Sequence, residues 1–234
     1  MCGRVAIFTP PLAMARLLEA GLADGIDPEG RPSWNVGPTR RIDGVAEVDG
    51  ARVLDRYRWG LIPSWAKDAS FGSRTFNARS ETVATKPSFR SAYKHRRLLV
   101  PIDGFYEWDR SGPGKPEPHY FSRADGSPVV LAGLHESWTD PAAPEGSAPL
   151  RSATVLTTEA GTDMDGIHDR MPVILEQGAF DLWLEAEAGD PALDALLGPA
   201  DAGTLVHHCV DRAVGNVRND GPELIEEPPP TSLF

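Results

Sequence analysis

Cysteine is scarce in this chain of 234 residues, which holds Cys2 and Cys209 and no C-x-x-C spacing. Two cysteines are too few for a disulfide framework, so a reducing compartment is expected. The N-terminus lacks the basic stretch and apolar run of a signal peptide, and no window reaches the roughly 18 apolar residues of a membrane span. The sequence therefore predicts a soluble, cytoplasmic protein, expected to be a monomer.

Recognisable metal and cofactor motifs are also missing. The sequence has no Walker loop, dinucleotide fingerprint or internal repeat. No familiar ligand spacing links five of the six histidines, namely His95, His119, His135, His207 and His208. We therefore predict no metal and no cofactor.

Positive charge is in short supply, because the formal net charge is −11, and this argues against binding a polyanion. The distribution weakens that argument. Between Arg52 and Arg110 the chain carries 12 Lys and Arg against 6 Asp and Glu. One basic face on an acidic body would suit nucleic acid, although arginines scattered over an ordinary solvated surface would give the same count.

Short apolar runs separated by turn residues predict a strand-dominated chain. A hairpin is predicted over 45–57 with its turn at Asp49-Gly50, and further strands at 98–101, 104–108, 119–122, 129–132, 151–158 and 171–175. Short helices are predicted between Pro11 and Gly21 and at 86–95, 179–186 and 191–197, with surface loops at 111–118 and 141–149. We expect an α+β fold in one domain over 1–225, with a mixed, barrel-like β core, peripheral helices and a frayed tail at 226–234.

The most informative segment is Met1-Cys2-Gly3-Arg4. A small second residue favours removal of Met1, which would leave the α-amine and the thiol of Cys2 on one residue. Their unperturbed pKa values are about 7.7–8.0 and about 8.5, so both are partly nucleophilic at neutral pH. Such an aminothiol suits hydrolysis by an N-terminal nucleophile or ring formation with a carbonyl. A small apolar residue opening a buried strand would look the same.

Three further segments carry residues suited to a site. If 76–82 is extended, Asn77, Arg79 and Glu81 share one face, a set that can hold a phosphate or a sugar but also resembles a solvated sheet face. Glu107 stands in an aromatic run, and neighbours that exclude water favour the neutral form of a carboxyl group, as acid–base work requires. His168 lies in a polar loop beside an arginine. The alternative for Glu107 is that strand alternation points its carboxylate to water. The alternative for His168 is an ordinary surface histidine.

Two tryptophans lie in the cation-flanked segment 58–67, which glycine and proline interrupt. Trp65, next to Lys67, suits a platform for unpaired bases, where stacking contributes about 1–3 kcal/mol per base. Trp59 would serve equally well in the core.

Taken in order, the motifs resemble one known family. They are Met-Cys-Gly-Arg, Trp-Gly-Leu-Ile-Pro-Ser-Trp from residue 59, Asn-Ala-Arg-Ser-Glu-Thr from 77, the stretch 96–108, and His-Asp-Arg-Met-Pro from 168, with 34–38 and 218–222 as further matches. This order is similar to the SRAP family, the SOS-response-associated peptidases, over nearly the whole chain. The segments 141–149 and 207–209 depart from the family pattern.

The resemblance implies a role in the response to DNA damage. It implies recognition of abasic sites in single-stranded DNA or at junctions with duplex, and a covalent thiazolidine between Cys2 and the opened sugar, which is lyase-like Schiff-base chemistry. By the family's pattern Glu107 shuttles protons, Asn77 orients the amine or imine, and His168 contacts the sugar oxygens. The residues implied to bind DNA are Arg4, Arg79 and Arg170 at flanking phosphates and Trp65 and Pro38 at neighbouring bases.

Two other classes stay open at this stage. A glutamine amidotransferase or related hydrolase would also begin Met-Cys-Gly and use the Cys2 thiolate with the α-amine as base. The glutamine-binding segments of such enzymes are not recognisable, and Glu107 and His168 would have no role. A peptidase that removes residues ahead of Cys2 is a further hydrolase option. The third class is a non-covalent single-strand binder in which Cys2 is structural.

Overall fold

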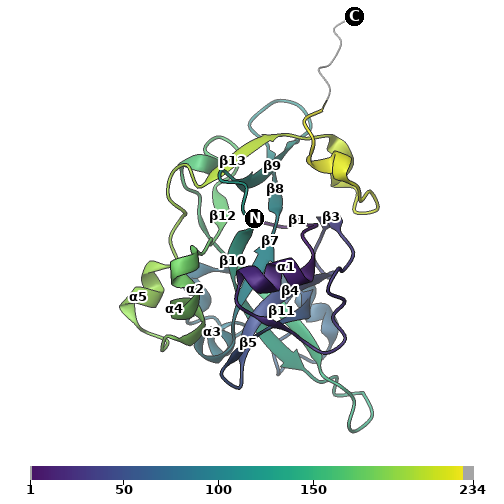
Figure 1. The fold of residues 1–234 in the computed structure, drawn as a ribbon, viewed down its shortest axis with the longest axis vertical. Coiled ribbons are helices and arrows are strands. Elements are labelled where there is room, and N and C mark those ends of the chain that lie inside the picture. Colours follow the sequence, from purple (N-terminus) through teal and green to yellow (C-terminus); the bar gives the residue numbers. More distant parts are fainter. Residues whose placement is uncertain (1, 229–234) are drawn as a thin grey trace, which may run out of the picture.

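The computed structural model describes residues 2–228, and its smaller sheet carries the start of the chain (Figure 1). This sheet has five strands in the order β13-β9-β8-β1-β3, and every neighbouring pair is antiparallel. Their bounds are β13 Leu205–Cys209, β9 Glu117–Arg123, β8 Gly104–Asp109, β1 Val5–Ile7 and β3 Ser33–Val36.

The larger sheet closes on itself into a barrel. Its main strands are β4 (Arg41–Val48), β5 (Ala51–Trp59), β7 (Arg97–Ile102), β10 (Val129–Trp138) and β11 (Leu150–Glu159). They pair in the order β5-β4-β7-β10-β11, and β11 returns to pair with β5 in parallel at Ser152 and Arg58. Three short strands extend the rim, namely β2 (Gly21–Leu22), β6 (Asn77–Arg79) and β12 (Arg170–Pro172). The predicted strand-dominated α+β class with a barrel-like core is confirmed.

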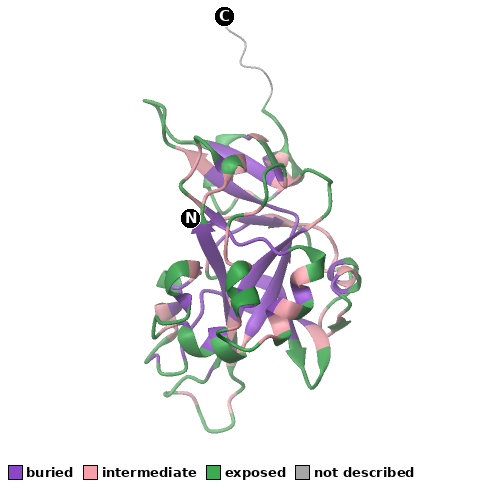
Figure 2. Cartoon of the chain, turned by 90° about the vertical axis from the view of Figure 1, so that its left-hand side faces the viewer, coloured by how far each residue is buried: buried purple, intermediate pink, exposed green. Residues whose placement is uncertain are grey.

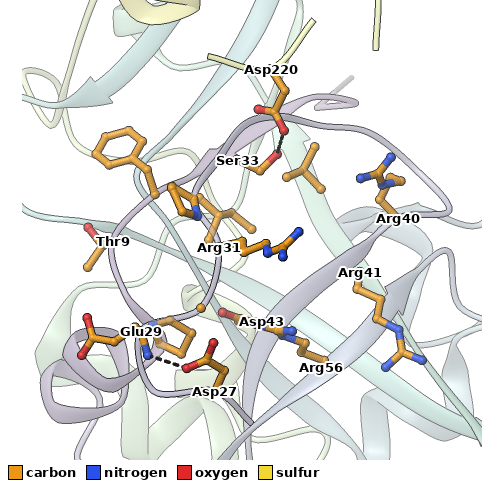
Figure 3. Close-up of a pocket in the computed structure, with 16 residues that line it drawn as sticks. Thr9, Asp27, Glu29, Arg31, Ser33, Arg40, Arg41, Asp43, Arg56 and Asp220 are labelled. Atoms are coloured by element: carbon orange, nitrogen blue, oxygen red, sulfur yellow. Dashed lines mark hydrogen bonds and ion pairs between the residues drawn. The ribbon is translucent and has the colours of Figure 1, made fainter. Parts of the chain in front are cut away.

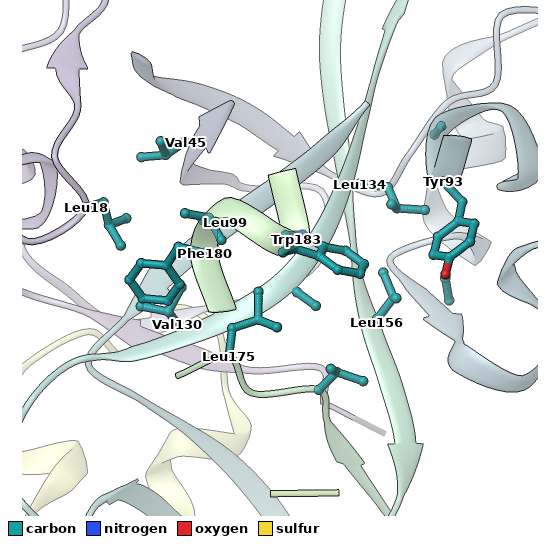
Figure 4. Packing of buried hydrophobic residues seen from close by; sticks show 14 of the residues in the cluster. Leu18, Val45, Tyr93, Leu99, Val130, Leu134, Leu156, Leu175, Phe180 and Trp183 are labelled. Atoms are coloured by element: carbon teal, nitrogen blue, oxygen red, sulfur yellow. The ribbon is translucent and has the colours of Figure 1, made fainter. Parts of the chain in front are cut away.

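Short helices cover the outside of the barrel, and buried residues concentrate in the strands that they cover (Figure 2). The α-helices are α1 Pro11–Leu17, α2 Ser80–Val83, α3 Arg90–His95, α4 Phe180–Glu185 and α5 Pro191–Ala195. The 3₁₀ helices are Ala69–Arg74, Thr162–Met164, Gln177–Ala179, Arg212–Gly215 and Pro222–Ile225. Figure 4 shows the contact: Phe180 and Trp183 of α4 pack with Leu99 and Val130 of the barrel strands. None of the helices in the described part of the chain is long and apolar enough to cross a membrane.

The hairpin with its turn at Asp49-Gly50 forms as predicted, because both turn residues adopt positive φ. All four predicted helices are shorter in the structure: α1 ends at Leu17, α3 begins at Arg90, α4 spans Phe180–Glu185, and α5 ends at Ala195. Strands β1, β2, β3 and β13 are not among the predicted strands. The tail prediction falls mostly outside the described residues, which end at Pro228, and Met1 lies outside them too.

The turn between β7 and β8 fixes the N-terminal strand. The buried Asp103 carboxylate accepts hydrogen bonds from the backbone N–H groups of Phe8 at 2.6 Å and Thr9 at 2.9 Å. At the next position a Cβ would lie 2.4 Å from the Phe121 carbonyl oxygen, so only glycine fits at Gly104. Strand β1 therefore lies directly against β8, and the residues that precede β1 lie beside the acid carried by β8.

Candidate active site around Cys2

Cys2 precedes β1 and its side chain is 0 % exposed. It belongs to the hydrophobic cluster that contains Phe105 and Met171. Burial, and then the charge of Glu107, raise the pKa of the Cys2 thiol far above its ordinary value, while a backbone hydrogen bond from Arg4 opposes the shift. The unperturbed thiol pKa therefore does not apply to the folded chain, which holds this thiol protonated at neutral pH.

Asn77 binds the backbone of the first residues directly. Its Nδ2 donates a hydrogen bond of 2.6 Å to the Cys2 carbonyl oxygen. Strand β6 holds it there through parallel pairing with β11, where Asn77 lies opposite Val155. The Asn77 Oδ1 is buried and has no hydrogen-bond partner among the described residues. A buried amide oxygen next to Cys2 can accept a hydrogen bond from an amine at that residue.

Glu107 points into the protein and not to water. Its side chain is buried on β8, and its Oε2 lies 3.9 Å from His168 Nε2. The backbone N–H of Arg170 donates to His168 Nδ1 at 2.9 Å. Because an amide can only donate, this contact leaves the ring proton of neutral His168 on Nε2, the nitrogen that faces Glu107. The exposed Asp169 carboxylate lies 3.0 Å from the same Nδ1.

Arg170 is held by an internal ion pair. Its guanidinium donates to both carboxylate oxygens of Glu81, one of them at 3.1 Å, and at 2.6 Å to the Thr157 carbonyl oxygen. The bond to Arg170 lowers the pKa of Glu81. The expectation that Glu81 shares a strand face with Asn77 is wrong, because the strand ends at Arg79 and Glu81 lies in the first turn of α2, where a carboxylate is favoured.

Arg4 is also committed inside the protein. Its Nη1 donates to Asn35 Oδ1 at 2.5 Å and to the Val214 carbonyl oxygen at 2.6 Å, and its guanidinium stands over the Trp108 ring at 5.9 Å. Burial lowers the pKa of Arg4. Asn35 was not singled out from the sequence, although it lies within the matching segment 34–38.

The remaining predicted DNA contacts lie nearer the surface. Arg79 is exposed at the end of β6, two residues after Asn77, and Pro38 is half-buried in the turn that follows β3. Trp65 is 57 % exposed and meets the Phe71 ring edge-on at 5.0 Å. Trp59 belongs to the core, where its Nε1 donates to the Phe76 carbonyl oxygen at 2.8 Å.

Next to the turn that follows β3 lies a cavity of about 630 Å³, which the sequence did not predict (Figure 3). Its charged lining consists of Arg31, Arg40, Arg41 and Arg56 with Asp27, Glu29, Asp43 and Asp220. Arg56 Nε lies 3.3 Å from Asp43, whereas Arg31, Arg40 and Arg41 are exposed. Three of the four arginines precede the basic stretch 52–110. Counting charges along the sequence therefore could not show that the four arginines lie together in the folded protein.

The family model described as SOS response associated peptidase (SRAP) matches residues 1–217. The chain belongs to the SRAP family. Among its relatives are abasic site processing proteins: YoqW of Bacillus subtilis is 39% identical over 97% of this chain and 99% of the relative, and YedK of Escherichia coli 33% identical over 97% and 99%. HMCES of Gallus gallus is 34% identical over 83% of this chain and 66% of its own.

Solved structures agree with the SRAP fold described above. A protein from Bacteroides thetaiotaomicron superposes with a TM-score of 0.85 at 22% identity, covering 97% of this chain and 100% of that one. A protein from Bordetella bronchiseptica superposes with a TM-score of 0.73 at 29% identity, covering 90% and 100%. In this SRAP chain Asn77, Glu107 and Cys2 meet at the junction of the two sheets, with His168 beside Glu107.

Proposed function

We propose that this SRAP protein captures abasic sites in single-stranded DNA by forming a thiazolidine with Cys2 after Met1 is removed. The observation that carries the proposal is the set of polar groups built around one buried N-terminal residue. Asn77 binds the Cys2 backbone, and the Glu107 charge acts on the Cys2 thiol. A cysteine that served only to fill the core would need neither. The names of the relatives, abasic site processing proteins, support the same substrate.

The chemistry joins both groups of Cys2 to one carbon. The α-amine attacks the aldehyde carbon C1′ of the ring-opened deoxyribose, and loss of one water gives an imine. The sulfur then adds to the same carbon, so that an S–C1′ bond replaces the second C–N bond and the thiol proton ends on nitrogen. The adduct therefore weighs one water less than protein and DNA together.

Both steps need protons moved in a site that excludes water. Glu107 helps to keep the thiol protonated, and the same carboxylate is placed to take that proton when sulfur attacks. His168, whose Nε2 lies 3.9 Å from Glu107, is placed to donate to the sugar oxygen that leaves when the ring opens. The buried Oδ1 of Asn77 orients the amine for attack.

The DNA strand approaches along exposed cations and rings. Arg79 lies next to the site, and Arg4, whose guanidinium is held by Asn35, adds charge from within. Arg170 binds a phosphate only when that phosphate replaces Glu81 in its ion pair. Trp65 offers a ring face to an unpaired base, and Pro38 separates bases beside the lesion, which favours single strands over duplex. The arginines of the neighbouring cavity continue the path for phosphates beyond Pro38.

The test is intact mass of the untagged protein after incubation with a single-stranded oligonucleotide carrying one abasic site. We expect one adduct that lacks one water, formed by the native chain and by Cys209→Ala but not by Cys2→Ala. Non-covalent binding that survives in Cys2→Ala would leave the binding surface in place. No adduct despite confirmed removal of Met1 would contradict the proposal, and release of ammonia from glutamine would then assign Cys2 to a hydrolase. The same mass spectra show whether Glu107→Gln retains Met1. Retention is expected if the protein removes its own Met1 with the help of Glu107.

A further inference from the structure

Four side chains of the kinds that bind metals gather at the edge of the smaller sheet, away from Cys2. Strand β9 contributes Glu117 and His119, and its neighbour β13 contributes His207 and Cys209. Cys209 lies directly opposite His119 in the ladder, and His207 lies opposite Phe121. Residues two apart in a strand, and residues opposite one another across a pair, share one face of a sheet, so all four side chains lie on the same face.

The distance between the two imidazoles is close to that of a zinc site, and the sulfur lies slightly farther out. His119 Nδ1 lies 3.1 Å from His207 Nδ1 and 4.0 Å from Cys209 Sγ. With Zn–N bonds of about 2.0–2.1 Å and a Zn–S bond of about 2.3 Å, a tetrahedral ion separates two nitrogens by ~3.3 Å and nitrogen from sulfur by ~3.6 Å. One ligand atom each of Glu117, His119 and Cys209 lies within 4.8 Å of the others. The group within 4.8 Å does not include His207, so a fourth ligand bond requires the His207 side chain to rotate toward the other three.

The electrostatics of the cluster favour a cation. The carboxylates of Glu117 and Asp109 lie near the Cys209 sulfur and place negative charge beside it. A divalent ion would bind Cys209 as thiolate and balance that charge.

We propose that Glu117, His119, His207 and Cys209 bind one Zn²⁺ ion. One thiolate, two imidazoles and one carboxylate are a ligand set that zinc accepts, and softer than the all-oxygen sets of magnesium or calcium. The sequence predicted no metal because these residues lie about 90 positions apart and show no motif; only the register of β9 with β13 brings them together. The segment 207–209 is also one of the two that depart from the family pattern.

The ion would link the edge strand β13 to β9, the strand that pairs with β8 of the candidate active site. His119 pairs with Cys209 on one side and with Glu107 on the other, so the three residues form one row across β13, β9 and β8. A metal in that row fixes β13 against β9 and thereby stiffens the backing of β8. Its proposed role is structural, and the inference does not rest on the function proposed for Cys2.

The test uses the untagged full-length protein, stripped with a chelator and titrated first with Co²⁺ and then with Zn²⁺. We expect one equivalent of Co²⁺ to give a thiolate-to-cobalt charge-transfer band with intense tetrahedral d–d bands, and Zn²⁺ to displace it. Cys209→Ser removes the charge-transfer band. His119→Gln weakens binding by more than about 100-fold, since even outer-shell changes at metal sites cost about 10–100-fold.

Two matched controls keep the test sharp. His208→Gln retains binding, because the His208 ring lies against Tyr120 on the opposite face and its Nε2 contacts the Ile225 carbonyl oxygen at 2.7 Å. Cys2→Ser also retains it, although an N-terminal aminothiol is itself a metal ligand. A band that depends on Cys2 and not on Cys209, or no band at all in a folded protein, would overturn the proposal. As a second readout, Zn²⁺ raises the Tm of the native chain but not that of Cys209→Ser.

Discussion

Cys2 and Cys209 are the same residue type in two different surroundings, and the surroundings assign them different chemistry. Cys2 is fully buried before β1, where an amide binds its backbone and a carboxylate acts on its thiol. Cys209 lies partly exposed on the edge strand β13, with its sulfur 3.6 Å from His119 Nε2. In both cases burial is the largest cause of a raised thiol pKa.

Neither thiol is therefore activated by its own acidity. What distinguishes them is what their neighbours offer. Around Cys2 the neighbours can move protons, and removal of one residue adds an amine. Around Cys209 the neighbours are imidazole and carboxylate groups, whose lone pairs can bind a cation. The proposed covalent capture and the proposed metal binding thus rest on the partners that the fold supplies, and the surroundings of one cysteine can be changed while the other serves as a control.

The largest effect is expected from blocking the amine. Insertion of a leucine between Met1 and Cys2 turns the α-amine of Cys2 into a peptide nitrogen, which cannot form an imine with an aldehyde. We expect adduct formation to fall to background, measured by denaturing gel and intact mass, while Co²⁺ binding at Cys209 is unchanged. Full cross-linking by this variant would contradict the imine step.

Next in size is removal of the acid beside each cysteine. Glu107→Gln keeps the shape but cannot move a proton, so the single-turnover rate of adduct formation should fall by about 10²–10⁴-fold, the range for general acid–base catalysis. Glu117→Gln, the acid beside Cys209, should leave that rate within twofold. Equal effects of the two variants would show that Glu107 acts through structure alone.

The two thiols should also differ in their reaction with iodoacetamide. In the chelated protein we expect Cys209 to be alkylated at least ~10-fold faster than Cys2, because burial shields the Cys2 sulfur from the reagent. Since both pKa values are raised, both rates keep increasing as the pH rises above about 8.5, the ordinary thiol value. Peptide mapping at intervals gives the two rates, and Zn²⁺ should slow only Cys209. Faster labelling of Cys2 would refute its buried placement.

The smallest effect concerns charge near the two sites. In a Cys2→Ala background, which isolates non-covalent binding, Arg79→Ala should weaken binding of single-stranded DNA a few-fold and reduce the salt slope by about 1. Arg123→Ala on β9 is the control, because that guanidinium is already paired with Glu176 at 2.9 Å on the side of Cys209. Fluorescence anisotropy at several salt concentrations measures the affinity and its salt dependence for both variants. An equal loss of affinity in Arg123→Ala would show that the DNA does not bind preferentially beside Arg79.

Local patterns predicted most of the barrel. The Asp49-Gly50 hairpin and the strands from residue 98 to 158 carry their own turn and alternation signals, and they form as expected. Strands β1 and β3 carry three and four residues, too few for a periodic signal, and they exist because the Asp103 turn pins β1 against β8. Edge strand β13 likewise depends on a partner more than 80 positions away.

The site was only partly predictable for the same reason. Motif order picked out Cys2, Asn77, Glu107 and His168, and the fold brings the first three together with His168 beside Glu107. It could not show that the Arg4 and Arg170 side chains are already bonded inside the protein, because their partners Asn35 and Glu81 lie far along the chain. Nor could motif order find the arginine cavity, which loop residues such as Asp27, Arg31 and Asp220 complete, or the cluster around Cys209, which depends on the register of β9 with β13.

Carbon NMR of the purified adduct, made with DNA labelled with ¹³C at C1′ of the abasic site, tests the proposed thiazolidine directly. We expect a single tetrahedral C1′ bonded to both the nitrogen and the sulfur of Cys2. A carbon that remains a C=N imine, or one bonded to oxygen while sulfur is attached elsewhere, would contradict it.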